Sequence, residues 1–226
     1  MKKNILLLSC LFLWFLPIAN FRLIDGDEGY YLFAAKLLLD GKTIYKDFFY
    51  PQTPLLPYIY KWWFSITGIS WINARLLHAI VTALIGFILF KNLLRINKKV
   101  ATLGLFLFLF SGYITGWFTI AKAYAMPVLL ILLACEFMQS KIFSKHFINI
   151  LFVGILLGLA INIRLYMIVL VPIFYIYSVK RFISHKTLNA NINISREASF
   201  LPSFLPSFLP SFLPVSNRWI RNCTFA

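Results

Sequence analysis

The sequence has few acidic residues and few cysteines. Only 7 of its 226 residues are Asp or Glu and only 13% are charged, whereas 61% are hydrophobic. Soluble domains are typically about a quarter charged and about half apolar. The three cysteines, Cys10, Cys135 and Cys223, are too few and too widely spaced for a disulfide framework. The composition therefore excludes a disulfide-stabilised secreted domain and indicates a protein that lies in a bilayer.

The sequence also lacks a concentrated basic patch, although its net charge is +15. Its Lys and Arg residues stand at the ends of apolar runs. This is the distribution of a membrane protein and not that of a nucleic-acid-binding surface. We therefore expect membrane lipids, and no nucleic acid, among its partners.

The sequence shows no His or Cys spacing typical of a metal site, no glycine-rich phosphate loop and no nucleophile elbow. Asp25, Asp27 and Glu28 are close in sequence, but such adjacent acids rarely converge on one ion without further ligands. We therefore expect no metal site and no cofactor.

Apolar segments predict an all-α fold, a polytopic bundle of about six transmembrane helices. The predicted spans are 5–24, 71–94, 100–120, 124–138, 147–161 and 165–178. The last two share one apolar stretch that is broken at Asn162-Ile163-Arg164, so we predict that they form the legs of a hairpin. Each leg would be roughly 22 Å long as a helix, which is short for a bilayer. The hairpin therefore either crosses the membrane fully or re-enters on the same side.

Basic clusters predict the orientation of these spans. The clusters are Lys2 and Lys3, residues 95–99, residues 141–145 and residues 180–186. Because loops rich in Lys and Arg face the cytoplasm, we expect a multi-pass protein of the cell membrane, plasma or inner, with a cytoplasmic N-terminus. The loop 25–70 then lies on the outer face.

This outer loop is predicted to contain interfacial helices. Residues 28–40 are helix-like with few polar positions, and Gly41 is a common C-terminal stop. Three prolines exclude one continuous helix through the next stretch, namely Pro51, Pro54 and Pro57. Aromatic residues that favour the headgroup level follow in the same region: Tyr50, Tyr58, Tyr60, Trp62 and Trp63.

The C-terminal region contains a short repeat. Residues 199–214 repeat Ser-Phe-Leu-Pro four times. A proline at every fourth position excludes both a helix and the interior of a sheet. We therefore predict that residues 187–226 form a disordered, low-complexity tail.

Three of the seven acids, Asp25, Asp27 and Glu28, occur within four positions directly after the first apolar segment. A partly desolvated carboxylate at a lipid–water boundary can act as a general base toward a hydroxyl group. We interpret Asp25 as an ordinary solvated residue of a loop. For Asp27 and Glu28 a catalytic role is predicted.

The stretch from Asp27 to Arg75 resembles the C-type superfamily of membrane glycosyltransferases. The closer match is to the branch of the protein O-mannosyltransferases and the aminoarabinose transferases. The resemblance rests on the Asp27-Glu28 pair, the element "YKDF" at 45–48, the segment "TPLLPYIYKWWFSITG" and Arg75 in "INARLLHAI". The stretch 154–177, in which a basic residue interrupts a hairpin, is also similar to a later segment of the family.

The resemblance implies that a sugar is transferred from a polyprenyl-phosphate carrier to a glycan, lipid or protein acceptor on the outer face. Asp27 of the Asp27-Glu28 pair would be the base. The donor phosphate would be bound by Arg75, Arg164 and Lys122, and the lipid-linked sugar would be a substrate, not a cofactor. Two alternatives stay open, because Arg75 could instead snorkel at a helix end and Lys122 could be an ordinary loop lysine.

Two other functions are compatible with the sequence. Members of the family usually carry further spans and often an outer soluble domain, so this chain resembles the front half of such an enzyme and could be an inactive fragment. A transporter or channel subunit is the second alternative, because an Arg and a Gly/Asn break interrupt apolar segments. Charged side chains at mid-depth in the membrane would favour the transporter.

Overall fold

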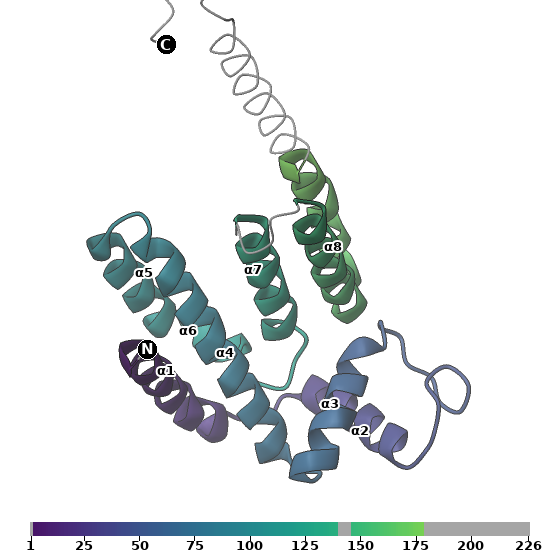
Figure 1. Ribbon diagram of the computed structural model, residues 1–226. Helices are drawn as coiled ribbons and strands as arrows, with labels where there is room; N and C mark the ends of the chain where they lie inside the picture. The colour runs from purple at the N-terminus through teal and green to yellow at the C-terminus, as the bar shows by residue number, and fades with distance from the viewer. Residues whose placement is uncertain (1, 140–145, 179–226) are drawn as a thin grey trace, which may run out of the picture. The chain divides into compact units, whose positions relative to one another are not determined.

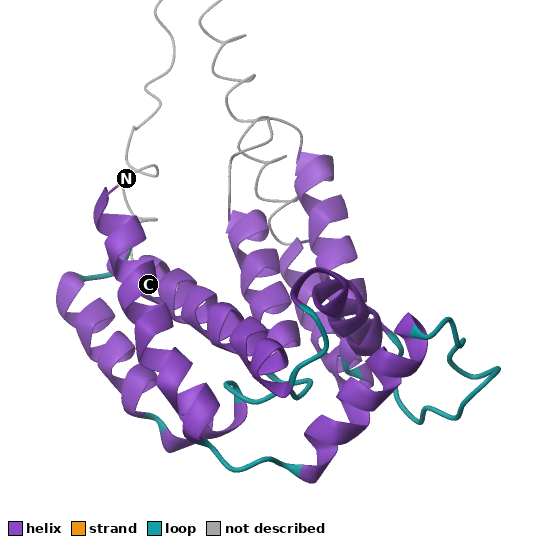
Figure 2. Cartoon of the chain, turned by 90° about the horizontal axis from the view of Figure 1, so that it is seen from below, coloured by secondary structure: helices purple, strands orange, loops and turns teal. Residues whose placement is uncertain are grey.

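The computed structural model describes residues 2–139 and 146–178, which form helices joined by loops (Figures 1 and 2). The elements are α1 (Lys2–Phe21), α2 (Gly26–Leu39), α3 (Leu55–Thr67), α4 (Trp71–Leu94), α5 (Lys98–Phe110), α6 (Gly112–Trp117), α7 (Ala125–Gln139), α8 (His146–Ile163) and the 3-10 helix η1 (Leu165–Leu170). The described residues contain no β-strand, only one isolated bridge between Ile44 and Phe48. The predicted all-α fold is thus confirmed for this part of the chain, while the predicted tail 187–226 lies outside the described residues.

Two helices, α1 and α4, are long and apolar enough to cross a membrane, judged by length and composition alone. α7, α8 and the segment Leu165–Ser178 are apolar but shorter. The segment 100–120 is divided, because α5 ends at Phe110 and Ser111 then caps α6 by accepting a hydrogen bond from the Ile114 N–H. The number of crossings, about six, therefore stays a prediction.

Helices α1, α4 and α5 pack side by side with alternating direction (Figure 1). Arg75 near the start of α4 contacts Ala19 near the end of α1. In the middle of α4, Gly86 lets α5 approach closely, since a Cβ at this position would lie 2.8 Å from the ring of Phe108. A larger residue would push the two helices apart, because closely packed interiors have no space for it.

Helices α7 and α8 and the segment after Arg164 form a second packed group. α8 ends at Ile163, and Arg164 has an extended backbone with φ −143° and ψ 110°. The chain then reverses, and Ser178 at the end of the returning segment donates a 3.5 Å hydrogen bond to the sulfur of Met138 near the end of α7. Arg164 therefore stands at the turn between two antiparallel legs.

Charged side chains gather at both ends of the helices. At one end the last turn of α4 meets the last turn of α7, where Arg95 and Glu136 form an ion pair of 2.7 Å. At the opposite end the last turn of α1, the first turns of α2 and α4 and the loop 118–124 converge. This second end holds Asp25, Asp27 and Glu28, and we call it the acidic end.

The start and the end of α2 follow from its sequence. Asp25 is the N-cap residue, and its side chain accepts a hydrogen bond from the Asp27 N–H while the Glu28 carboxylate accepts one from the Asp25 N–H. These reciprocal bonds satisfy N–H groups that the first helical turn leaves free. Beyond the last helical residue, Leu39, Gly41 has φ +84°, a left-handed conformation that favours glycine.

The aromatic residues in and just before helix α3 fall into a buried set and an exposed set. Its first turn contains Pro57, which is tolerated there because the missing N–H has no partner in the helix. Tyr60 is fully buried, whereas Tyr58 and Trp62 are exposed. Tyr50, from the loop before α3, is also buried. Thus Tyr50 and Tyr60 are core residues, and for Tyr58, Trp62 and the partly buried Trp63 the headgroup position stays a prediction.

The opposed helix ends allow a direct test of orientation. In a chain whose cysteines are replaced by serine, we expect Lys46→Cys to react with an impermeant thiol reagent added to intact cells. Lys98→Cys is expected to react only after the cells are permeabilised, because its loop is on the basic side. Both positions are exposed, so accessibility to the reagent is matched. Labelling of Lys98→Cys alone in intact cells would invert the orientation.

Candidate active site

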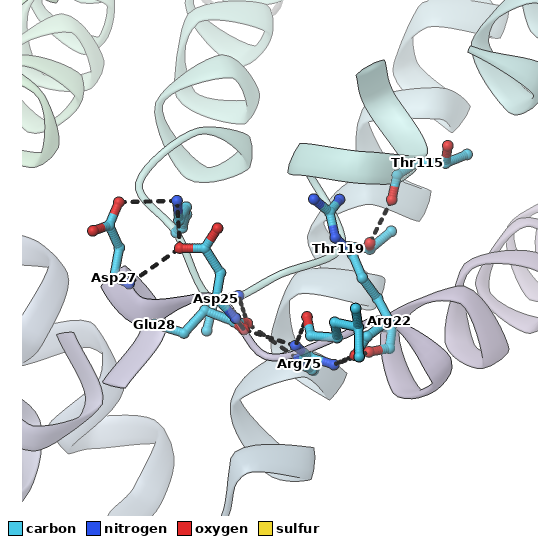
Figure 3. Close-up of polar contacts among 11 residues, drawn as sticks. Arg22, Asp25, Asp27, Glu28, Arg75, Thr115 and Thr119 are labelled. Carbon is cyan, nitrogen blue, oxygen red and sulfur yellow. Dashed lines mark hydrogen bonds and ion pairs between the residues drawn. The ribbon is translucent and has the colours of Figure 1, made fainter. Parts of the chain in front are cut away.

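A buried ion pair joins Glu28 of α2 to Arg75 of α4. Arg75 Nη2 lies 2.7 Å from Glu28 Oε2, and Arg75 Nε donates to Glu28 Oε1 at 3.1 Å (Figure 3). The side chain of Arg75 is 3% exposed and that of Glu28 is 0% exposed. This two-point geometry is the strongest form of an arginine–carboxylate contact. It fixes α2 against α4 at a position 47 residues later in the chain.

Arg75 also binds the C-terminal end of α1. Its Nη1 donates to the carbonyl oxygens of Ala19 at 2.8 Å and Arg22 at 2.7 Å, and its Nη2 donates to that of Leu23 at 3.1 Å. Carbonyl groups at the end of a helix have no partner within the helix, so the guanidinium completes their hydrogen bonding. With the two bonds to Glu28, all five N–H groups of Arg75 are used. Arg75 therefore has no free donor for a phosphate in this arrangement.

Glu28 connects the same network to the loop after α6. Its Oε1 accepts a hydrogen bond of 2.7 Å from the Ala121 N–H. Burial acts to raise the pKa of Glu28, but the hydrogen bonds from Arg75, Ala121 and Asp25 outweigh burial and lower it below its usual value. Glu28 is thus an ionised, enclosed carboxylate that positions three segments of the chain.

A second ion-pair cluster lies beside the first, and its centre is Lys122. The Nζ of Lys122 is 2.8 Å from Asp25 Oδ1 and 2.9 Å from Asp27 Oδ2. The Lys122 side chain is 5% exposed, whereas those of Asp25 and Asp27 are 30% and 67% exposed. Asp27 is therefore the most accessible carboxylate of the cluster, held in place by a buried cation.

The charges in this second cluster support one another. Burial acts to lower the pKa of Lys122, but its hydrogen bonds to Asp25 and Asp27 outweigh burial and raise the pKa. The hydrogen bond from Lys122 lowers the pKa of Asp25, and the N–H of Asp27 adds to this effect. Lys122 therefore remains a cation at neutral pH, as the predicted role of a phosphate ligand requires, but its charge is directed at two acids of the chain.

Sequence analysis missed two residues of this end, Arg22 and Trp117. The Arg22 guanidinium carbon lies 5.3 Å from the centre of the Trp117 ring, and Lys122 Nζ lies 4.7 Å from the same centre. Both are cation–π distances. Arg22 is a charged residue at the end of an apolar segment, which is a usable signal, but its contact with Trp117 joins residues far apart in the chain.

Arg164 lies at the rim of the same end. Its Nε donates a long hydrogen bond of 3.4 Å to the Ala123 carbonyl, next to Lys122 in the chain. Its guanidinium carbon is 4.8 Å from the ring of Tyr124 and 5.7 Å from that of Tyr166. Among the described residues, its two terminal nitrogens have no hydrogen-bond partner. Arg164 is therefore oriented by aromatic rings and keeps free donors.

These free donors border a cleft of about 730 Å³ between the loop 45–53 and the hairpin turn at Arg164. The lining is mostly aromatic and apolar, with Gln52, Thr53 and Arg164 as its polar members. Binding sites for small organic ligands commonly have this size and this mixture of groups.

The loop wall of the cleft is rigidly built around Tyr45 and Gln52. Tyr45 has φ +69°, a conformation that side chains other than glycine rarely adopt. Its hydroxyl donates to the Gln52 carbonyl at 2.5 Å, and the Tyr31 hydroxyl donates to Gln52 Oε1 at 3.1 Å. Tyr50 stacks on Tyr30 with the ring planes 1° apart. Such fixed, strained loops are typical of ligand sites.

A series of buried polar side chains contacts the loop 118–124. The Tyr60 hydroxyl and His78 Nε2 are 2.6 Å apart, and both residues are fully buried. Thr82, one turn after His78, donates to the carbonyls of His78 and Phe118 at 2.8 and 3.0 Å. His78 is thus a packed helix residue that helps to position the loop carrying Lys122.

Four of the five predicted site residues are brought together: Asp27 and Lys122 in one ion-pair cluster, Glu28 and Arg75 in the adjoining one. Arg164 lies apart, at the cleft, and is linked to the others through Ala123. In the described part of the chain, no group of three or more His, Cys, Asp or Glu side chains could hold a metal ion. The absence of a metal from the mechanism stays a prediction.

Comparison with known proteins identifies one family. Residues 51–201 match the model of the dolichyl-phosphate-mannose-protein mannosyltransferases. The matched segment contains Arg75, Lys122 and Arg164 and the part of the cleft lining from Pro51 onward, but it starts after Asp27, Glu28 and Tyr45. No curated protein and no solved structure matches the chain.

Proposed function

The chain belongs to the dolichyl-phosphate-mannose-protein mannosyltransferase family of membrane glycosyltransferases, and from this premise we propose the chemistry of its acidic end. We propose that a sugar is transferred here from a polyprenyl-phosphate carrier to a hydroxyl acceptor on the outer face of the membrane. The observation that carries the proposal is that the accessible carboxylate of Asp27 pairs with Lys122, whose chain neighbour Ala123 accepts a hydrogen bond from Arg164 at the cleft.

Asp27 is proposed to be the general base. A base must reach the acceptor hydroxyl, and the Asp27 side chain is 67% exposed, whereas Glu28 next to it is fully enclosed. Lys122 fixes the orientation of the Asp27 carboxylate. Glu28 and Arg75 are proposed to be positioning residues, because their charges are directed at each other and at backbone groups.

Arg164 is proposed to bind the donor phosphate within the cleft. Its terminal nitrogens can donate two parallel hydrogen bonds to phosphate oxygens. The aromatic rings of Tyr45 and Tyr166 would pack against the apolar faces of the sugar. In transfer, the acceptor hydroxyl gives its proton to Asp27 and its oxygen bonds to the anomeric carbon of the sugar. The bond from that carbon to the phosphate oxygen breaks, and the carrier phosphate leaves with the electron pair.

The distribution of charge favours this proposal over a transporter or channel. Arg75, Lys122 and Arg164 all lie at helix ends or in loops of the described chain, whereas a transporter site was expected at mid-depth. The exposure of the Asp27 side chain is also compatible with an inactive fragment. Donor binding and sugar transfer are therefore tested separately.

Donor binding is tested with mannosyl farnesyl phosphate, which carries the sugar in the family's name on a short isoprenyl chain. In dodecyl maltoside micelles we expect Arg164→Gln to weaken its binding roughly 10- to 100-fold, the usual effect of losing a hydrogen-bonded charge. Arg95→Gln, at the opposite end, is the control and should bind as the unmodified chain does. Equal affinity in Arg164→Gln would exclude the cleft as the donor site.

A further inference from the structure

Arg22 makes no direct ion pair, although its positive charge helps to lower the pKa of Asp25. Arg75 pairs with Glu28 and Arg95 with Glu136, but among the described residues Arg22 forms no ion pair and its guanidinium donates no hydrogen bond. A guanidinium is charged at every physiological pH and has five N–H donors. The side chain is partly buried, so water alone does not surround it.

The position of this guanidinium is nevertheless fixed. It lies 5.3 Å from the centre of the Trp117 ring, and a Cβ added at Gly116 would lie 2.8 Å from its Nη1. The side chain therefore folds back over α6 instead of extending into solvent. An ordered, unpaired arginine on an aromatic ring is suited to bind an oxyanion with parallel hydrogen bonds.

The chain neighbours of Arg22 are apolar and exposed. Phe21 and Leu23, on either side of it, are each 89% exposed, and Ile24 is 64% exposed. An anion bound here would have largely exposed apolar side chains next to it. Such a surface fits an amphiphile with a phosphate above a hydrocarbon chain better than it fits a free anion.

We propose that Arg22, held on Trp117, is a binding site for the phosphate of a membrane lipid. Two kinds of lipid present this chemistry at the headgroup level, an isoprenyl phosphate and a phospholipid. The site is separate from the cleft at Arg164, since none of the cleft's lining residues belongs to α1 or α6. In Figure 3, Asp27 and Arg22 lie to either side of Asp25.

The test counts farnesyl phosphate molecules bound to the 226-residue chain by native mass spectrometry from dodecyl maltoside micelles, which contain no phosphate. We expect two for the unmodified chain, one for Arg22→Gln, one for Arg164→Gln and none for the double variant. Arg22→Lys, which keeps the charge, should retain partial occupancy. Arg95→Gln should bind two. Farnesol and inorganic phosphate, each lacking half of the ligand, should bind at least roughly tenfold more weakly.

The outcomes separate this inference from the proposed function. Unchanged binding in Arg22→Gln would overturn the Arg22 site, even if Arg164→Gln loses its ligand and the proposed donor cleft stands. Inorganic phosphate binding as tightly as farnesyl phosphate would overturn the lipid assignment. Displacement from the Arg22 site by dihexanoyl phosphatidic acid identifies a phospholipid as the natural occupant, and resistance to displacement identifies an isoprenyl phosphate. Either result supports a lipid-phosphate site.

Discussion

Arg75→Met is expected to destabilise the protein by about 3–5 kcal/mol, because it leaves the buried carboxylate of Glu28 without its cation. The same change removes the hydrogen bonds to three carbonyls at the end of α1. Unfolding is measured by titrating sodium dodecyl sulfate into dodecyl maltoside micelles. Arg95→Met is the matched control, because it breaks an exposed ion pair of the same length. Such a pair contributes only about 0–1 kcal/mol.

The pH dependence of unfolding provides an independent check. The pKa of Glu28 is lowered from its ordinary value of 4.5 in the folded chain. Ionised Glu28 therefore stabilises the fold fully above pH 4.5, and this contribution is lost as the pH falls through the lowered pKa. Glu28→Gln should remove that acid-dependent loss.

If Arg75→Met lowers the free energy of unfolding no more than Arg95→Met does, the buried network does not hold the helix ends together.

Asp27 and Glu28 are neighbours in the sequence, but the side chain of one is exposed and that of the other is buried. The sequence alone does not show which of the two is buried. Asp27 and Glu28 are consecutive in α2, so helix geometry turns their side chains about 100° apart. One of them must therefore face away from the other. That Glu28 is the enclosed one depends on Arg75, which is 47 positions away. Local pattern can identify such a pair, but only tertiary packing assigns the roles.

The apolar runs predicted the helix bounds to within three residues, except in the segment 100–120. α4 has the bounds expected from sequence, Trp71–Leu94, because its apolar run ends at a basic cluster. The segment 100–120 is divided at Ser111, since a serine that caps the following turn competes with continuation of the helix. Similarly, Tyr50 and Tyr60 are of a residue type that favours the headgroup level, but both are buried. Their burial results from tertiary packing of the loop, which the local sequence does not predict.

Asp27→Asn is expected to lower sugar transfer by about 10² to 10⁴, the usual effect of losing a general base. Asp25→Asn should keep most activity, because Asn is also a good N-cap residue and Asp27 still holds Lys122. Transfer is followed as release of polyprenyl phosphate. If the 226-residue chain does not turn over alone, both changes are made in a longer family member at the positions that match Asp25 and Asp27. Equal losses at both positions would mean that the acids act as a negative surface, not as one base.

The central claim is that the acidic end binds a lipid-linked sugar phosphate, and photo-crosslinking tests it most directly. Mannosyl farnesyl phosphate with a diazirine on the sugar is irradiated with the purified chain, and the labelled peptides are mapped. Labels are expected in residues 23–30, 42–53, 118–124 and 163–168, all suppressed by excess unlabelled donor. Labels confined to the opposite end, around Arg95 and Gln139, would contradict it.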